Sequence, residues 1–84
     1  MNRRKLLARL AVGALQNVAF RDIDQLAKGF GFTLERQRGS HRIYVHPRIS
    51  EQLNLQDVGG TAKPYQIRQL LRLVERYDLR LEDE

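Results

Sequence analysis

The chain has 84 residues, which is enough for one domain with a small core. It contains no cysteine, so disulfide bonds and thiolate metal sites are excluded. Its 15 lysine and arginine residues outnumber its 10 acidic residues and give a net charge of +5, which favours a polyanionic partner such as nucleic acid.

The N-terminal segment, residues 1–16, is predicted to be a helical extension running from Arg3 to Leu15. Arg9 interrupts its apolar run and no small-x-small cleavage site follows, so the segment does not fit a signal peptide. No stretch approaches the roughly 18 apolar residues of a membrane span. We expect a cytoplasmic protein whose first helix packs on its own domain or supports a homodimer; a membrane-surface helix is the alternative. The apolar residues of an amphipathic helix are Leu6, Leu7, Leu10 and Leu15.

A second helix is expected in the segment FRDIDQLAKGFGF, which begins at Phe20. Its apolar residues recur at helical spacing. Asp22 and Asp24 lie in the first turn, where the helix dipole favours negative charge. Gly31 is a plausible stop, although Gly29 is an unfavourable helix residue that could end the helix sooner.

Three antiparallel strands are expected next, over 32–37, 41–46 and 52–57. Gly39 allows the first turn, and Pro47 ends the second strand because it cannot donate to a strand ladder. The second strand alternates between two sets of side chains, namely His41, Ile43 and Val45 on one face and Arg42, Tyr44 and His46 on the other. The segment VGGTAKP is expected to be a glycine-rich connection.

The last helix is expected to begin near Lys63 or Pro64, because proline suits the first helical turn. One stripe of this helix is apolar and comprises Ile67, Leu70, Leu71 and Val74. A second stripe is cationic and comprises Arg68, Arg72 and Arg76. The cationic stripe either tracks phosphates or is simply a solvated face.

Together these elements predict an α+β fold with the α-β-β-β-α order of double-stranded-RNA-binding domains. A three-stranded antiparallel sheet is covered by helices, and the N-terminal helix is additional. We expect residues 1–84 to form a single domain, with a core at 20–79 and an acidic tail at 80–84.

The stretch RQRGSHRIYVHP, residues 36–47, contains both histidines of the chain among arginines and no acid. Histidine suits proton transfer near neutral pH, and the arginine guanidinium matches phosphate oxygens. RNA is cleaved when its 2′-OH attacks the adjacent phosphate, and His41 could take that proton without a metal or other cofactor. The expected RNA-binding residues are Arg36, Arg38, Gly39, Ser40, Arg42, Tyr44, His46, Lys63, Arg68 and Arg72.

Several of these residues have a structural alternative. Ser40 has no acid partner for a triad, so it is a turn residue or a phosphate hydrogen-bond donor. Tyr44 could stack on a base or pack in the core. His46, which precedes Pro47, is either structural or a phosphate contact.

The segment GFTLERQRGSHRIYVHP resembles the HicA toxin family, small bacterial ribonucleases of toxin–antitoxin pairs with a fold like that of double-stranded-RNA-binding domains. The resemblance rests on Gly31-Phe32, on Gly39-Ser40-His41 before a strand, and on the Lys63-Pro64 opening of the last helix. It implies that His41 is catalytic, that the substrate is mRNA, and that a HicB-like antitoxin is the protein partner. Many members carry another histidine before the last helix, whereas this chain has Val58-Gly59-Gly60-Thr61 there.

Two classes of function follow from the sequence. The first is a metal-independent endoribonuclease, an mRNA interferase toxin. The second is a non-catalytic RNA-binding or protein-interaction module on the same fold. His41 distinguishes them, because only the enzyme requires it.

Overall fold

The structure is a computed structural model, in which residues 2–82 are described. Its four strands form one antiparallel sheet in the order β1-β2-β3-β4. The expected α+β fold, with the α-β-β-β-α order and an additional N-terminal helix, is confirmed. Two acids of the expected acidic tail, at 83 and 84, lie outside the described residues. The elements are α1 (Arg3–Ala11), α2 (Phe20–Gly29), β1 (Thr33–Arg38), β2 (His41–His46), β3 (Ile49–Val58), β4 (Thr61–Ala62) and α3 (Pro64–Arg76).

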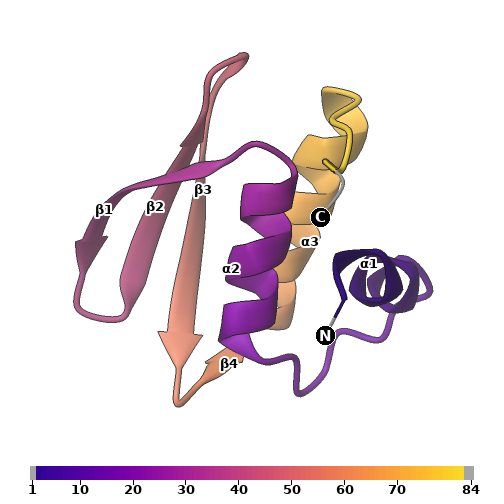
Figure 1. The fold of residues 1–84 in the computed structure, drawn as a ribbon. Coiled ribbons are helices and arrows are strands. Elements are labelled where there is room, and N and C mark those ends of the chain that lie inside the picture. Colours follow the sequence, from indigo (N-terminus) through magenta and orange to yellow (C-terminus); the bar gives the residue numbers. More distant parts are fainter. Residues whose placement is uncertain (1, 83–84) are drawn as a thin grey trace.

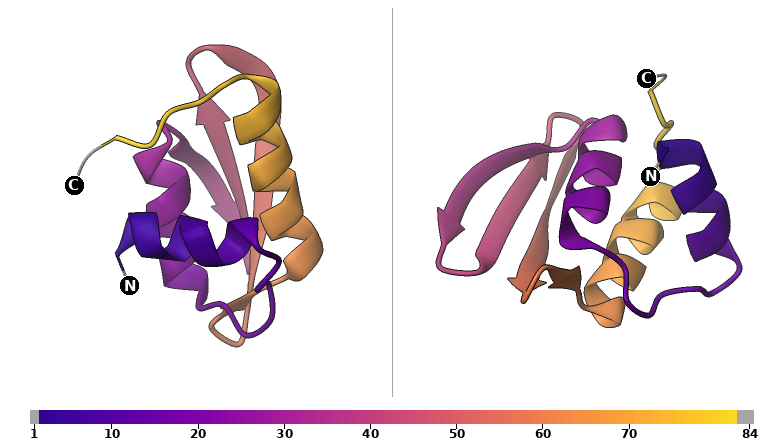
Figure 2. Two further views of the ribbon diagram at one scale, coloured as in Figure 1. Left: turned by 90° about the vertical axis from the view of Figure 1, so that its right-hand side faces the viewer. Right: turned by 60° about the horizontal axis from the view of Figure 1, so that its bottom comes forward.

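The molecule has three layers. Helices α2 and α3 lie side by side on one face of the sheet (Figure 1). Helix α1 crosses them on the side away from the sheet (Figure 2). The sheet therefore has a covered face toward α2 and α3. On its opposite face, which we call the open face, no helix of residues 2–82 lies.

The core lies between the covered face and the two helices. Apolar side chains at helical spacing on α2 and α3 pack against alternate side chains of β2 and β3, so the buried faces of the helices and of the sheet form one core. Full burial of a large apolar side chain stabilises the fold by roughly 1.5–3 kcal/mol. The largest fully buried side chains are Ile23, Leu26, Phe32, Tyr44, Leu53, Leu55, Ile67 and Leu70.

Helix α1 packs on its own domain. The Asn2 side chain accepts hydrogen bonds from two backbone N–H groups of the first turn, at 2.8 and 3.2 Å. Leu6 and Leu10 are buried, and α1 contacts α2. The helix ends at Ala11 rather than at the expected Leu15, because Gly13 has φ +91 and terminates it.

Gly29 is the last residue of α2, and two other segments pack closely against it. A β-carbon there would lie 2.8 Å from Leu81 Cδ1 and 3.0 Å from Arg3 Cδ. The backbone N–H of Glu82 donates to the Gly29 carbonyl at 2.7 Å. The start of α1 and the segment after α3 therefore meet at this glycine.

The glycine-rich connection contains a strand that the sequence analysis did not expect. Gly59 and Gly60 both have positive φ and form a two-residue hairpin between β3 and β4. The sheet consequently has four strands rather than three. β3 also begins earlier than expected, at Ile49, because Pro47 is part of a tight turn that pairs His46 with Ile49.

Replacing Gly31 with alanine is expected to destabilise the fold in two ways. Gly31 has φ +99, and a β-carbon there would lie 2.8 Å from Nε2 of the buried His46. The strained backbone costs roughly 1–3 kcal/mol, and loss of the His46 hydrogen bond costs about as much again. The measurement is the free energy of unfolding in urea. Gly13→Ala is the control, because Gly13 has φ +91 and nothing within 4 Å of an added β-carbon. Equal losses in the two variants would contradict the close packing at Gly31.

Candidate functional site

His41 is the first residue of β2 and follows the two-residue turn Gly39–Ser40. Gly39 has φ +58, a conformation that glycine adopts without strain. The backbone N–H of Asp57 donates to the Ser40 carbonyl at 2.9 Å. The side-chain amide of Gln56 donates to the Ser40 hydroxyl at 3.2 Å. The turn is therefore tied to β3, and these contacts fix where β2 begins.

The part of β3 that holds this turn is itself held by α3. The buried side chain of Gln66 accepts a hydrogen bond from the Gln56 backbone N–H at 2.7 Å. β4 pairs with β3 only at Asp57 and Val58, so it supplies no strand partner for Gln56. The Gln66 amide takes the place of that missing partner.

The open face carries two neighbouring rows of paired residues, with His41 at the centre of one and Ile43 at the centre of the other. Side chains directly opposite each other on antiparallel strands have their β-carbons about 4.5–5.5 Å apart. Each row runs from an arginine on β1, across β2, to an amide side chain on β3. The rows are Arg38–His41–Gln56 and Arg36–Ile43–Asn54.

A shallow hollow of about 380 Å³ lies over this part of the open face. None of the residues that line it is acidic, and two of them are arginines on the same side of His41. This arrangement suits an anionic ligand, with the guanidinium groups toward a phosphate and the imidazole within reach of its sugar. The lining residues are Arg36, Gln37, Arg38, His41, Ile43 and Asn54.

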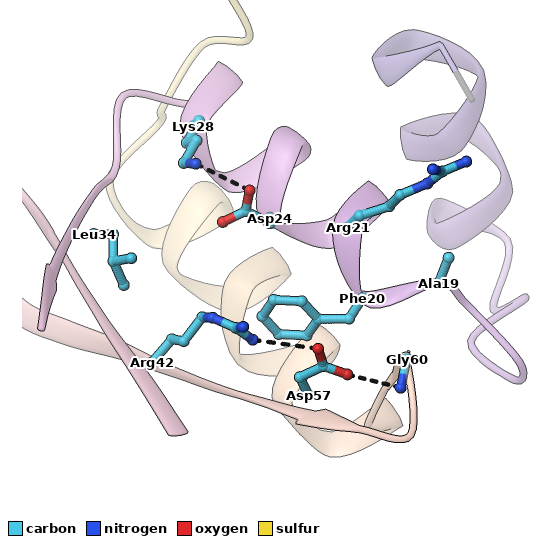
Figure 3. A pocket seen from close by; sticks show the side chains of 9 residues that line it. All are labelled: Ala19, Phe20, Arg21, Asp24, Lys28, Leu34, Arg42, Asp57 and Gly60. Carbon is cyan, nitrogen blue, oxygen red and sulfur yellow. Dashed lines mark hydrogen bonds and ion pairs between the residues drawn. The ribbon is translucent and has the colours of Figure 1, made fainter. Parts of the chain in front are cut away.

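Arg42 lies on the covered face, so the structure does not bring it to His41. Its guanidinium stacks over the Phe20 ring at 4.5 Å and forms an ion pair with Asp57 at 3.5 Å. Figure 3 shows Arg42 and Asp57 in a larger hollow of about 610 Å³. This hollow is lined by residues of α2, by one residue from each of β1, β2 and β3, and by Gly60. Lys28 in that hollow is also paired, with Asp24 at 3.0 Å. Arg21 also lines this hollow, but the two acids of the hollow neutralise the other two cations and would repel a phosphate. This hollow therefore suits a phosphate less well than the smaller one, which has no acid.

Tyr44 is a core residue in this structure. Its side chain is fully buried, and its hydroxyl donates to an Asp24 carboxylate oxygen at 2.5 Å. Burial and this hydrogen bond raise the pKa of the Tyr44 hydroxyl. Of the two roles that the sequence left open, the core role is the one that fits; the ring has no exposed face for a base.

His46 is also buried, and both of its ring nitrogens have partners. Nε2 lies 3.0 Å from the Phe30 carbonyl oxygen, and Nδ1 accepts the backbone N–H of Arg48 at 3.1 Å. The ring packs edge-on against Phe32. These contacts give His46 a structural role, so among the two histidines of the chain only His41 is exposed.

The remaining basic residues expected at the site belong to the helical layer. Lys63 caps α3 and lies 5.9 Å from the Tyr65 ring. Arg68 and Arg72 are exposed on α3. Because α3 covers the opposite face of the sheet (Figure 1), Arg68 and Arg72, which lie on this helix, do not share a surface with His41.

The amino-acid sequence matches a known protein family. Residues 20–75 match the family model described as the HicA toxin of bacterial toxin–antitoxin systems. The chain belongs to the HicA toxin family. The matched region runs from the start of α2 into the last turn of α3, so α1 lies outside it. Membership of this family implies an antitoxin partner. No curated relative and no solved structure matches the chain at a significant level.

Within residues 2–82 of this HicA-family protein, no three His, Cys, Asp or Glu side chains gather as they would to hold a metal ion. No helix in the same range is long and apolar enough to cross a membrane.

Three residues of the open face were not among the site residues expected from the sequence of this HicA-family chain, namely Ile43, Asn54 and Gln56. Ile43 follows His41 by two positions, and the two amides lie across from them on β3. Strand alternation and the pairing register together would have identified all three. The register was missing because the tight turn at Pro47 was not recognised from the sequence.

Proposed function

We propose that this chain is a metal-independent endoribonuclease, an mRNA interferase that acts as the toxin of a toxin–antitoxin pair in the cytoplasm. The observation that carries the proposal is that the one exposed imidazole lies beside two arginines in an acid-free hollow. Family membership supports the toxin role. The imidazole and the two guanidinium groups are side chains suited to proton transfer and phosphate binding, which supports the ribonuclease role.

His41 is the general base of the proposed reaction. The neutral imidazole removes the proton of a ribose 2′-OH, because histidine is the side chain that most often transfers protons in catalysis. The 2′-oxygen then attacks the adjacent phosphorus and forms the O2′–P bond. The bond from phosphorus to the 5′-oxygen breaks, and that oxygen takes a proton from the imidazolium or from water. The products are a 2′,3′-cyclic phosphate and a 5′-hydroxyl.

Arg36 and Arg38 hold the phosphate in this scheme. They lie across the β1–β2 pair from Ile43 and His41, respectively. A guanidinium can donate two parallel hydrogen bonds to phosphate oxygens and can stabilise the negative charge that grows on them during attack. Arg42 is left out of this role because Asp57 and Phe20 hold it on the covered face.

A HicB-like antitoxin is the proposed protein partner, and the open face is its proposed docking surface. Covering His41 there would block RNA from the hollow. Ile43 and Val45 leave half-buried apolar surface on the same face, which a protein partner could bury.

The test is cleavage of a short single-stranded RNA by the purified chain in EDTA, followed by analysis of the cut ends. We expect a 2′,3′-cyclic phosphate on one fragment and a 5′-hydroxyl on the other. A matched RNA with a single 2′-deoxy nucleotide before the cut should stay intact there, because the attacking hydroxyl is missing. Cleavage of the deoxy-substituted bond, or loss of activity in EDTA, would reject the mechanism.

A further inference from the structure

The open face changes its chemistry from strand to strand around His41. β1 contributes guanidinium groups, β2 contributes the imidazole and an isoleucine, and β3 contributes amides. Neighbouring strands lie about 4.8 Å apart, so about 10 Å separates the arginines from the amides. That span is the scale of one nucleotide from its phosphate to the edge of its base.

Apart from His41, the hollow has three lining residues without a basic side chain, namely Gln37, Ile43 and Asn54. The side-chain amide of Gln37 donates to the Gly39 carbonyl at 3.4 Å, within the turn before His41, whereas Ile43 and Asn54 face each other across β2 and β3. Ile43 is half-buried and presents an apolar surface, on which a flat ring can lie. Asn54 is directly opposite Ile43 and is exposed. Its amide offers two donor hydrogens and an acceptor oxygen, which can pair with the edge of a nucleobase.

Gln56 has a different role, although it is also an amide on β3. Its side chain donates to the Ser40 hydroxyl, and its backbone N–H is held by Gln66. It therefore supports the turn before His41. Asn54, by contrast, lies in the hollow directly opposite Ile43.

We propose that Ile43 and Asn54 form a subsite for one unpaired nucleobase next to the scissile phosphate. Single-stranded RNA exposes the base edges that such a subsite reads. The inference rests on the proposed ribonuclease function for its substrate, and it adds the selection of the base. Ile43 supports the plane of the base, Asn54 selects its edge, and the phosphate lies toward Arg36 and Arg38.

The first experiment measures binding without cleavage. The His41→Ala protein is titrated with four seven-residue oligouridylates that carry A, C, G or U at the central position. We expect one central base to bind best. Asn54→Ala in the same background should reduce the ratio of best to worst affinity by about 5- to 150-fold, the range for one two-bond amide contact.

Gln52→Ala is the matched control, because Gln52 is an exposed amide of the same strand and lies outside the hollow. It should leave the ratio unchanged. An unchanged ratio in Asn54→Ala, an equal loss in Gln52→Ala, or equal affinities for all four RNAs would overturn the subsite.

The second experiment separates this inference from the proposed function. Cut ends of an RNA library are sequenced for the parent protein and for Asn54→Ala with His41 intact. Loss of a base preference at one position beside the cut, with cleavage retained, supports the subsite. Cleavage with an identical preference in both proteins overturns the subsite and leaves the ribonuclease standing. Absence of cleavage by the parent overturns the ribonuclease, and the binding experiment then decides the subsite by itself.

Discussion

Replacing His41 with asparagine is expected to lower the rate of RNA cleavage by about 10²- to 10⁴-fold, the usual loss when a general base is removed. Asparagine keeps a polar side chain of similar reach but cannot accept a proton near neutral pH. His41 is exposed, so the fold should be unaffected. The measurement is the single-turnover rate at saturating protein, together with the affinity for RNA, which we expect to change little.

The second histidine provides the control. His46 is buried between Phe30 and the Arg48 backbone, so His46→Asn should lower the free energy of unfolding by about 1–3 kcal/mol. Its cleavage rate per folded molecule should equal that of the parent. We therefore expect His41→Asn to lower activity but not stability, and His46→Asn to lower stability but not activity. Full activity in a folded His41→Asn protein would reject His41 as the catalytic base and would favour the alternative of a non-catalytic binding module.

The order of the elements was predictable because helical and strand periodicities differ clearly in this chain. The Gly59–Gly60 hairpin was not recognised, since a glycine-rich segment also fits an irregular connection. The position of α1 on the other two helices could also not be predicted from the spacing of its apolar residues. An amphipathic helix must bury its apolar face, but the sequence alone does not say against which surface.

The candidate site was predictable only in part. Alternation along β2 separated His41 from Arg42 correctly, yet it could not say which side faces the helices. Apolar content would have favoured Ile43 and Val45 as core residues. The structure instead buries Tyr44, whose hydroxyl reaches Asp24 across the core boundary. This orientation places Arg42, Tyr44 and His46 away from the open face and leaves the isoleucine beside the imidazole.

A HicB-like antitoxin is expected to lose at least about 100-fold in affinity when Arg36 and Arg38 are both replaced with glutamate. Individual close charge pairs at protein interfaces contribute about 1.5–7 kcal/mol, and charge reversal adds repulsion against the acidic side chains that we expect to pair with these arginines. The affinity is measured with the product of the neighbouring gene, at two salt concentrations. The loss should be smaller at high salt, because screening weakens both attraction and repulsion.

Two further measurements make this expectation specific to the open face. Arg68→Glu with Arg72→Glu carries the same charge change on α3, behind the sheet, and should affect the affinity far less. Diethyl pyrocarbonate should modify His41 in the free protein and fail to modify it in the complex. The buried His46 should react in neither state, so each reading comes from one imidazole. If the antitoxin leaves His41 reactive, or if the α3 pair weakens binding more than the β1 pair, the antitoxin docks on the helical layer and inhibits the toxin from a distance.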